Sequence, residues 1–410
     1  MITLFLLFSS FFALLAYNIE HPHYTNPRLA IVSFMAGWLT GELALHHILL
    51  QASIVLFFVL MGAVWGLHGV IGLGLCFYAW SNMANFYYNG YKARDEVEAA
   101  LKAGLGFDYQ NSIDPNVIAQ FAERPDASLL RRPLTRTDPD VELIKDIPFG
   151  DFGQALDIRR SKISAQCQPV LLQIHGGGWT EKMGSKNEQA LPLMNHMAKR
   201  GWICVAVSYR LSPTATFPDH IIDCKQAIVW IKDKIAEYGG DPDFIVVTGG
   251  SAGGHLSSLV ALTPNDPGFQ PGFEDQDTTV QGAVPFYGSF DMTDSRQRCH
   301  NDGLLEILET SVMKMSLRGH EVQFDNISPL KRIHPDAPPF MVVHGDKDTL
   351  VPVEMSRDFV AELSTVSENP AVYAEISGGQ HAFDILPSIR SEFVKFGVER
   401  FLGWVYANKN

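Results

Sequence analysis

The stretch Gly249-Gly250-Ser251-Ala252-Gly253-Gly254 lies between the apolar run Phe244 to Thr248 and a helical pattern that begins near Gly253. A serine hydroxyl is a poor nucleophile at neutral pH, so an enzyme that uses one must expose it on a sharp turn beside a base and backbone amides. Glycines two residues before and two residues after Ser251 permit such a turn, because they have no Cβ atom to collide there. The stretch predicts a nucleophile elbow; an ordinary Gly/Ser loop is the competing interpretation.

Short apolar runs alternate with amphipathic stretches on both sides of this elbow, the clearest amphipathic stretch being Asp219 to Tyr238. Such runs are typical of strands buried in a parallel sheet, so the fold class is α/β with a mainly parallel, doubly wound sheet. An antiparallel hairpin, Val141 to Ile147 with Ala155 to Arg159, precedes them. The runs are Val170 to Ile174, Ile203 to Val207, Phe244 to Thr248, Val280 to Tyr287, Phe340 to His344 and Val372 to Ile376.

Reactive groups in such a sheet collect at the carboxyl ends of the strands. The motif His175-Gly176-Gly177-Gly178-Trp179 directly follows one predicted strand. Three successive glycines leave backbone N–H groups free to point at an oxyanion, so this motif predicts an oxyanion loop. A flexible glycine-rich turn is the alternative.

The predicted base and acid lie on later loops. His381 follows the last strand, where the chain order serine, acid, histidine requires the base, and His344, His255, His320 and His334 compete less well. The loop after Phe340 to His344 holds two aspartates, of which only one can orient the histidine. Asp348, further into the loop, is favoured, and Asp346 is interpreted as a turn residue that accepts backbone N–H bonds.

With these motifs in family order, residues from about 140 to 405 resemble the α/β-hydrolase fold and, within it, the hormone-sensitive-lipase-like serine esterases. The resemblance implies Ser251 as nucleophile, Asp348 as orienting acid and His381 as base, with the amides of Gly177, Gly178 and Ala252 as the oxyanion hole. It also rests on supporting motif residues, namely Tyr209-Arg210-Leu211-Ser212-Pro213, Tyr238 to Pro242, His175, Gly176, Trp179, Gly249, Gly250, Gly253, Asp348-Thr349-Leu350 and His381-Ala382-Phe383.

The chain departs from that family at Ser212 to Pro218, where relatives commonly continue with Ala-Pro-Glu. Because this segment helps to shape the pocket in relatives, the departure weakens the substrate assignment and leaves the triad intact. Feruloyl and acetyl-xylan esterases, kynurenine formamidases and prenylcysteine methylesterases look similar around the same motifs, so the family leaves the acyl group open.

Residues 1 to 90 are expected to form a helical membrane region of two to three spans. Met1 to Tyr17 is apolar without the charged start of a secretory signal, which favours an anchor; a signal peptide or an interfacial helix remains an alternative. Leu29 to Trp80 has one acidic residue, Glu42, and is long enough for a two-helix hairpin with a break near His46 to Gln51. Aromatic residues near its end suggest an interfacial belt.

The early positive charges, Arg28, Lys92, Arg94 and Lys102, lie on one side of such a membrane region. The positive-inside rule therefore places the catalytic domain in the cytoplasm. Residues 91 to 139 are expected to be a juxtamembrane helix and a linker, and 140 to 410 the catalytic domain. Residues 291 to 333 are too long for a plain loop and are a candidate cap over the pocket, with a peripheral insertion as the alternative.

Composition limits the other partners. The net charge of −13 disfavours nucleic-acid binding, and five scattered cysteines make disulfides and zinc improbable, so no metal or cofactor is expected. The expected partners are membrane lipids and a small-molecule or lipid-like ester. The alternatives are a serine peptidase or a formamidase-like amidase on the same fold and, less favoured, a non-catalytic membrane binding module.

Overall fold

The computed structural model describes residues 1–163 and 165–409. Its centre is an eight-stranded sheet with the order β1-β2-β4-β3-β5-β6-β7-β8. The hairpin of β1 and β2 is antiparallel, β2 also runs antiparallel to β4, and the pairs from β4 to β8 are parallel. The strands are β1 Val141–Phe149, β2 Gln154–Ser161, β3 Gln168–Ile174, β4 Ile203–Val207, β5 Gly240–Gly250, β6 Gly282–Phe286, β7 Phe340–Gly345 and β8 Ala371–Ile376. Each predicted apolar run is therefore a strand, and the predicted hairpin is confirmed.

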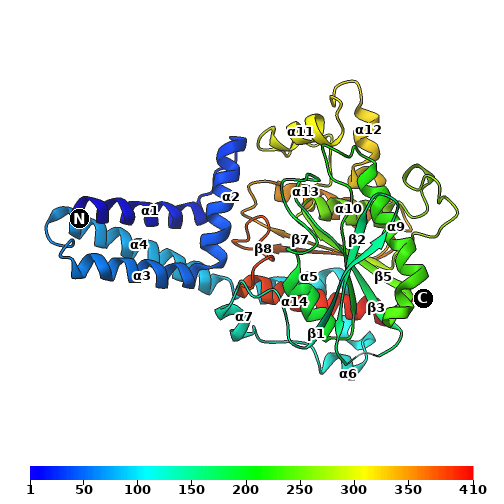
Figure 1. The fold of residues 1–410 in the computed structure, drawn as a ribbon, viewed down its shortest axis with the longest axis horizontal. Helices are drawn as coiled ribbons and strands as arrows, with labels where there is room; N and C mark the ends of the chain where they lie inside the picture. The colour runs from blue at the N-terminus through cyan, green and yellow to red at the C-terminus, as the bar shows by residue number, and fades with distance from the viewer. Residues whose placement is uncertain (164, 410) are drawn as a thin grey trace.

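Helices cover both faces of the sheet, which explains why its inner strands are apolar along their whole length. One buried cluster joins alternate strand residues to α9 Asp219–Lys234, α10 Ala252–Leu262 and α13 Val353–Val366. A second cluster joins the remaining strand residues to α5 Lys92–Leu105, α8 Leu191–Lys199 and α14 Ile389–Ala407. The result is the three-layer arrangement visible in Figure 1.

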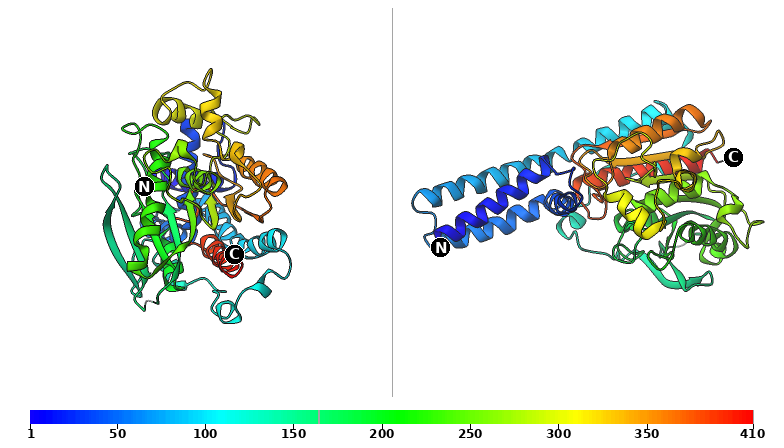
Figure 2. Two further views of the ribbon diagram at one scale, coloured as in Figure 1. Left: turned by 90° about the vertical axis from the view of Figure 1, so that its right-hand side faces the viewer. Right: turned by 90° about the horizontal axis from the view of Figure 1, so that it is seen from above.

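The N-terminal region consists of α1 Ile2–Glu20, α2 Pro27–Glu42, α3 Ala44–Leu60 and α4 Leu67–Asn89. Helices α1, α3 and α4 form a bundle that projects from the domain containing the sheet, with the N-terminus at its far end, whereas α2 crosses the base of the bundle (Figures 1 and 2). By length and composition, α1 could cross a bilayer alone, and α2 with α3 meets the same criterion but is bent by 88°.

The break predicted near His46 to Gln51 is wrong, because these residues lie inside α3 and the chain bends at Leu43 instead. Gln51 does not interrupt the helix because its Oε1 accepts a hydrogen bond from Trp80 Nε1 at 3.2 Å inside the bundle. At the bend, Gly41 packs against the ring of Phe86, where a Cβ atom would lie 2.8 Å from Cε1. Leu29 to Trp80 is thus three helices and not a simple hairpin.

Helix α5, expected as a juxtamembrane helix, is also part of the hydrophobic core beside the sheet. Ala93, Val97 and Leu101 are buried in the cluster that includes β8 and α14. A Cβ atom on Gly397 of α14 would lie 1.9 Å from Val97 Cγ1, so the two helices are in close contact. Short helices follow α5 and lead to the sheet, namely η1 Tyr109–Ser112, α6 Pro115–Ile118 and α7 Ala127–Arg131.

The candidate cap, residues 291–333, contains the predicted helical segment as α11 Gly303–Ile307 and the π-helical turn η4 Leu308–Val312. Helix α12 Glu321–Asn326 and the 3₁₀ turn η5 Pro329–Arg332 complete it. Phe217 N–H donates to Val312 O at 2.9 Å, so the cap is tied to the segment that follows Ser212. The remaining 3₁₀ turns are η2 Ile235–Tyr238 and η3 Pro267–Phe269.

Candidate active site

Ser251 occupies the turn between β5 and α10 with φ 59° and ψ −121°, a conformation that a non-glycine residue rarely adopts. Its neighbours leave no room for side chains. A Cβ atom on Gly253 would lie 2.0 Å from the carbonyl oxygen of Ile174, and one on Gly249 would lie 2.5 Å from the backbone of Gly253. The glycines therefore allow strand, turn and helix to approach closely enough to hold Ser251 in this strained backbone conformation.

Asp348 and His381, which are 33 residues apart, form a buried pair at the carboxyl ends of β7 and β8. His381 Nδ1 donates to Asp348 Oδ2 at 2.6 Å. The other carboxylate oxygen accepts the backbone N–H groups of Leu350 and Val351 at 2.8 and 2.9 Å. A carboxylate held in this way fixes the ring orientation and the tautomer of the histidine.

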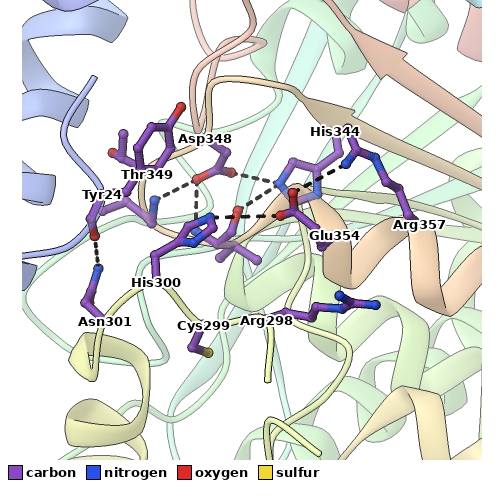
Figure 3. A network of polar contacts seen from close by, with 12 residues as sticks. Tyr24, Arg298, Cys299, His300, Asn301, His344, Asp348, Thr349, Glu354 and Arg357 are labelled. Carbon is purple, nitrogen blue, oxygen red and sulfur yellow. Dashed lines mark hydrogen bonds and ion pairs between the residues drawn. The ribbon is translucent and has the colours of Figure 1, made fainter. Parts of the chain in front are cut away.

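A second histidine, His344, also donates to Asp348, with 3.0 Å between Nε2 and Oδ2 (Figure 3). Its Nδ1 accepts a hydrogen bond from Ser356 Oγ at 2.6 Å, which fixes the tautomer. Burial alone would raise the pKa of Asp348, but attraction to His381 and hydrogen bonds from His344 and His381 hold the pKa below its ordinary value. Sequence reasoning treated His344 only as a competing base; its spacing of four residues before Asp348 was the available signal.

Asp346, the other aspartate of this loop, accepts the backbone N–H of Gly378 at 2.7 Å. It therefore accepts a backbone hydrogen bond, as expected, but from the loop before His381 and not from its own turn. The bond joins the loop that carries the acid to the loop that carries the histidine.

The glycine motif after β3 lies directly against Ser251. A Cβ atom on Gly176 would lie 3.1 Å from Ser251 Cβ, and Gly177 and Gly178 have φ values of 117° and 62°. Among residues 1–163 and 165–409, no hydrogen bond uses the N–H of Gly177, Gly178 or Ala252 as its donor. Ala252 also begins α10, whose N-terminus favours negative charge. Three unused amides thus surround the elbow.

Ser212 begins the segment that differs from the family pattern, and its backbone supports the glycine-rich loop after β3. Ser212 N–H donates to Trp179 O at 2.8 Å, and Ser212 O accepts from Glu181 N–H at 3.0 Å. Tyr209 Oη donates to His175 O at 2.9 Å. Trp179 Nε1 donates to His255 at 3.2 Å, which gives that buried histidine a structural partner. Although this segment differs from the family pattern, it is still hydrogen-bonded to the predicted oxyanion loop.

Tyr287, which sequence reasoning did not single out, packs between the elbow and the histidine. Its ring centroid is 4.6 Å from that of His381, and a Cβ atom on Gly250 would lie 2.7 Å from its hydroxyl. The hydroxyl donates to Asp384 Oδ1. Burial and then the charge of Asp384 raise the pKa of Tyr287 well above its ordinary value, so the hydroxyl stays protonated. Tyr287 fills the space between the loops that hold Ser251 and His381.

A serine on a strained turn, a histidine held by a carboxylate and unused amides at a helix N-terminus are the groups that acyl transfer requires. The BD-FAE family model matches residues 156–363, which include Ser251, Asp348 and the glycine motif. The chain belongs to the BD-FAE family. This confirms the resemblance to α/β-hydrolase esterases.

Relatives in Mycobacterium tuberculosis support the same assignment. The chain is 46% identical to probable carboxylic ester hydrolase LipM over 345 residues, covering 80% of this chain and 76% of LipM. It is 45% identical to esterase LipQ, covering 64% of this chain and 63% of LipQ. Among solved structures, the bifunctional GH43-CE protein of Bacteroides eggerthii matches with a TM-score of 0.55 at 24% identity, over 63% of this chain and 38% of that one. This structural likeness bears on the fold alone.

Proposed function

We propose that the protein is a membrane-anchored serine esterase that cleaves carboxylic esters with Ser251, His381 and Asp348. It is an enzyme of the serine hydrolase class acting on ester bonds, as its BD-FAE family membership and its esterase relatives indicate. The observation that carries the assignment of residues is the 2.6 Å bond between His381 and Asp348 on loops beside the strained Ser251 turn.

In the proposed reaction, His381 removes the proton from Ser251 Oγ as this oxygen attacks the ester carbonyl carbon. The amides of Gly177, Gly178 and Ala252 stabilise the oxyanion. His381 then donates its proton to the departing alcohol, which leaves an acyl-enzyme. His381 then takes a proton from water as the water oxygen attacks the acyl carbon, and returns it to Ser251 Oγ when the bond between this oxygen and the acyl carbon breaks, which releases the acid and the free serine.

A fluorophosphonate probe tests the nucleophile, because it forms a covalent bond only with an activated serine. The wild-type protein should be labelled, Ser251→Ala should not, and exposed Ser112→Ala should be labelled as strongly as the wild type. Labelling of Ser251→Ala would refute the assignment. A matched ester and anilide then compare ester with amide cleavage, and a higher kcat/KM for the ester is expected.

Exposed apolar side chains support membrane anchoring by residues 1–90. Leu7, Phe11 and Leu14 on α1 and Leu49, Leu50 and Leu56 on α3 are all more than half exposed on the projecting bundle. Several exposed apolar side chains gathered on one bundle are typical of a surface that contacts another protein or a lipid bilayer. Helix α2, which contains Arg28, and helix α5, which begins at Lys92, lie at the end of the bundle that meets the catalytic domain, and this supports a cytoplasmic catalytic domain.

Cys167, the exposed cysteine, gives a test of membrane side. A membrane-impermeant maleimide should label Cys167 only after the cells are opened. In a Cys167→Ser background, Trp65→Cys at the far end of the bundle should be labelled in intact cells. Labelling of Cys167 in intact cells would reverse the proposed orientation.

A further inference from the structure

Helix α2 from the N-terminal region contacts the loops that carry the acid and the base. Thr349 Oγ1, next to Asp348, donates to the carbonyl oxygen of Ala30 at 3.0 Å. The ring of Phe34 meets His381 edge to face, with centroids 5.7 Å apart and an interplanar angle of 83°. One turn further, a Cβ atom on Gly37 would lie 3.6 Å from Gln380 Nε2. Gln380 Oε1 in turn accepts the backbone N–H groups of Thr349 and His381, each at 2.9 Å.

The segment before α2 contacts the candidate cap. Asn301 Nδ2 donates to Tyr24 O at 2.6 Å, and the rings of Tyr24 and His300 lie 5.2 Å apart (Figure 3). Burial, followed by the charges of Asp346, Asp348 and Glu354, raises the pKa of Tyr24 to about 12. Residues 24–37 therefore form one continuous segment that contacts the cap at one end and the His381 loop at the other.

The opposite face of α2 is exposed, and beyond Arg28 in its first turn it is apolar. Leu29, Ile31, Val32 and Met35 are each more than 40% exposed, and they lie on the side away from Ala30 and Gly37. The helix makes an 88° angle with α3 and crosses the base of the projecting bundle (Figures 1 and 2). If the bundle crosses a bilayer, α2 lies in the plane of its surface, the usual position of an interfacial helix. Like the exposed side chains of α1 and α3, those of this face are apolar, so lipid is the expected occupant.

The position of Phe34 against His381 also bears on the substrate. In acyl transfer the histidine gives its proton to the leaving alcohol, so a side chain packed against the histidine borders the alcohol part of the ester. The half-buried Phe34 has one side on this ring and belongs to a helix whose outer face is apolar.

We propose that α2 lies on the bilayer surface and forms one side of the substrate site. There, Phe34 determines specificity for an ester whose alcohol is apolar and resides in the membrane. This proposal rests on the proposed esterase function. The substrate then reaches Ser251 from the bilayer surface past α2. The catalytic site is thus completed by the N-terminal region and not by the catalytic domain alone.

The test of Phe34 uses full-length protein in lipid nanodiscs and two ester series. One series keeps a butyryl group and lengthens the alcohol from methyl to dodecyl; the other keeps a methyl alcohol and lengthens the acyl chain. Phe34→Ala should change the ratio of kcat/KM between long and short alcohols by about tenfold, since methylene-scale changes in a pocket alter specificity by at least that factor. Phe34→Trp should shift this ratio in the opposite direction, and both should leave the acyl series within about twofold.

Phe11→Ala, on the exposed face of α1, is the matched control and should keep both profiles. Equal fluorophosphonate labelling of all variants identifies folded, active protein. If the wild-type protein is not labelled by the fluorophosphonate, the proposed esterase function itself is refuted. Intact labelling with an unchanged alcohol profile in both Phe34 variants, or an equal change in the acyl series, would refute only the role of Phe34.

A fluorophore attached to Met35→Cys in the Cys167→Ser background tests the bilayer contact, because the exposed Cys167 would otherwise be labelled as well. Nitroxide groups near the lipid surface should quench it, and aqueous iodide should not. The same fluorophore at Val322→Cys, an exposed site on α12, should show the reverse. Iodide quenching at position 35 equal to that at 322 would show that α2 faces water and would refute the bilayer contact.

Discussion

The bundle of α1, α3 and α4 and the sheet of the catalytic domain use similar apolar residues in opposite ways. In the sheet, residues such as Val246, Val247 and Val342 are completely buried between two helical layers. In the bundle, Leu49 and Phe77 are about 70% exposed. An apolar run alone therefore does not say what covers it: in the sheet the cover is protein, and for the bundle we propose that it is lipid.

The largest expected effect is a loss of kcat when the buried pair of Asp348 and His381 in the catalytic domain is disturbed. Asp348→Asn keeps the shape of the side chain but accepts poorly from His381 Nδ1, so the histidine adopts the wrong tautomer. We expect kcat to fall by about 10⁴-fold with little change in KM. Asp346→Asn, two residues earlier, is the control and should cost far less; an equal loss would contradict the assignment of Asp348 as the orienting acid.

A lysine on each exposed surface tests the difference between the two regions directly. Leu50→Lys near the middle of α3 should oppose membrane insertion by about 3 kcal/mol. Leu134→Lys, on a leucine before the sheet that is more exposed than Leu50, should cost almost nothing. Alkaline extraction of membranes measures both, and equal retention of both variants would show that the bundle does not contact lipid.

His344→Gln tests the second hydrogen bond to Asp348. Removing a bond to a charged, buried group costs about 1.5–3 kcal/mol, so kcat should fall about ten- to hundredfold while KM changes little. A role in stability alone would instead lower the melting temperature and leave kcat per labelled serine unchanged. Active-site titration with the fluorophosphonate separates the two results.

The smallest effect tests the boundary between the regions, where α5 continues the bundle into the core. Gly397→Ala places a methyl group against Val97 and should destabilise the catalytic domain by about 1–3 kcal/mol. Val97→Ala should relieve the collision, so the double variant should lose less stability than the two single variants lose in total. Additive effects in thermal unfolding would show that α5 is a linker that packs weakly.

Much of the catalytic fold could be predicted because its signals are local. Ile203 to Val207 is a strand with the predicted bounds, and Gly249 to Gly254 occupies the predicted turn. The bend at Leu43 could not be predicted, since Gln51 looks like a helix interruption until its partner Trp80 is known. Likewise, the sequence predicted a juxtamembrane helix within residues 91 to 139 but not the face of the sheet that this helix covers.

The sequence by itself determined the strands, the glycines that only a strained turn requires and the order of serine, acid and histidine along the chain. Tertiary structure alone decided that His344 shares Asp348 with His381 and that Phe34 reaches His381 from the N-terminal region. The physical reason is that backbone propensity acts within a few residues, whereas these contacts join loops and helices that meet only when the sheet is assembled.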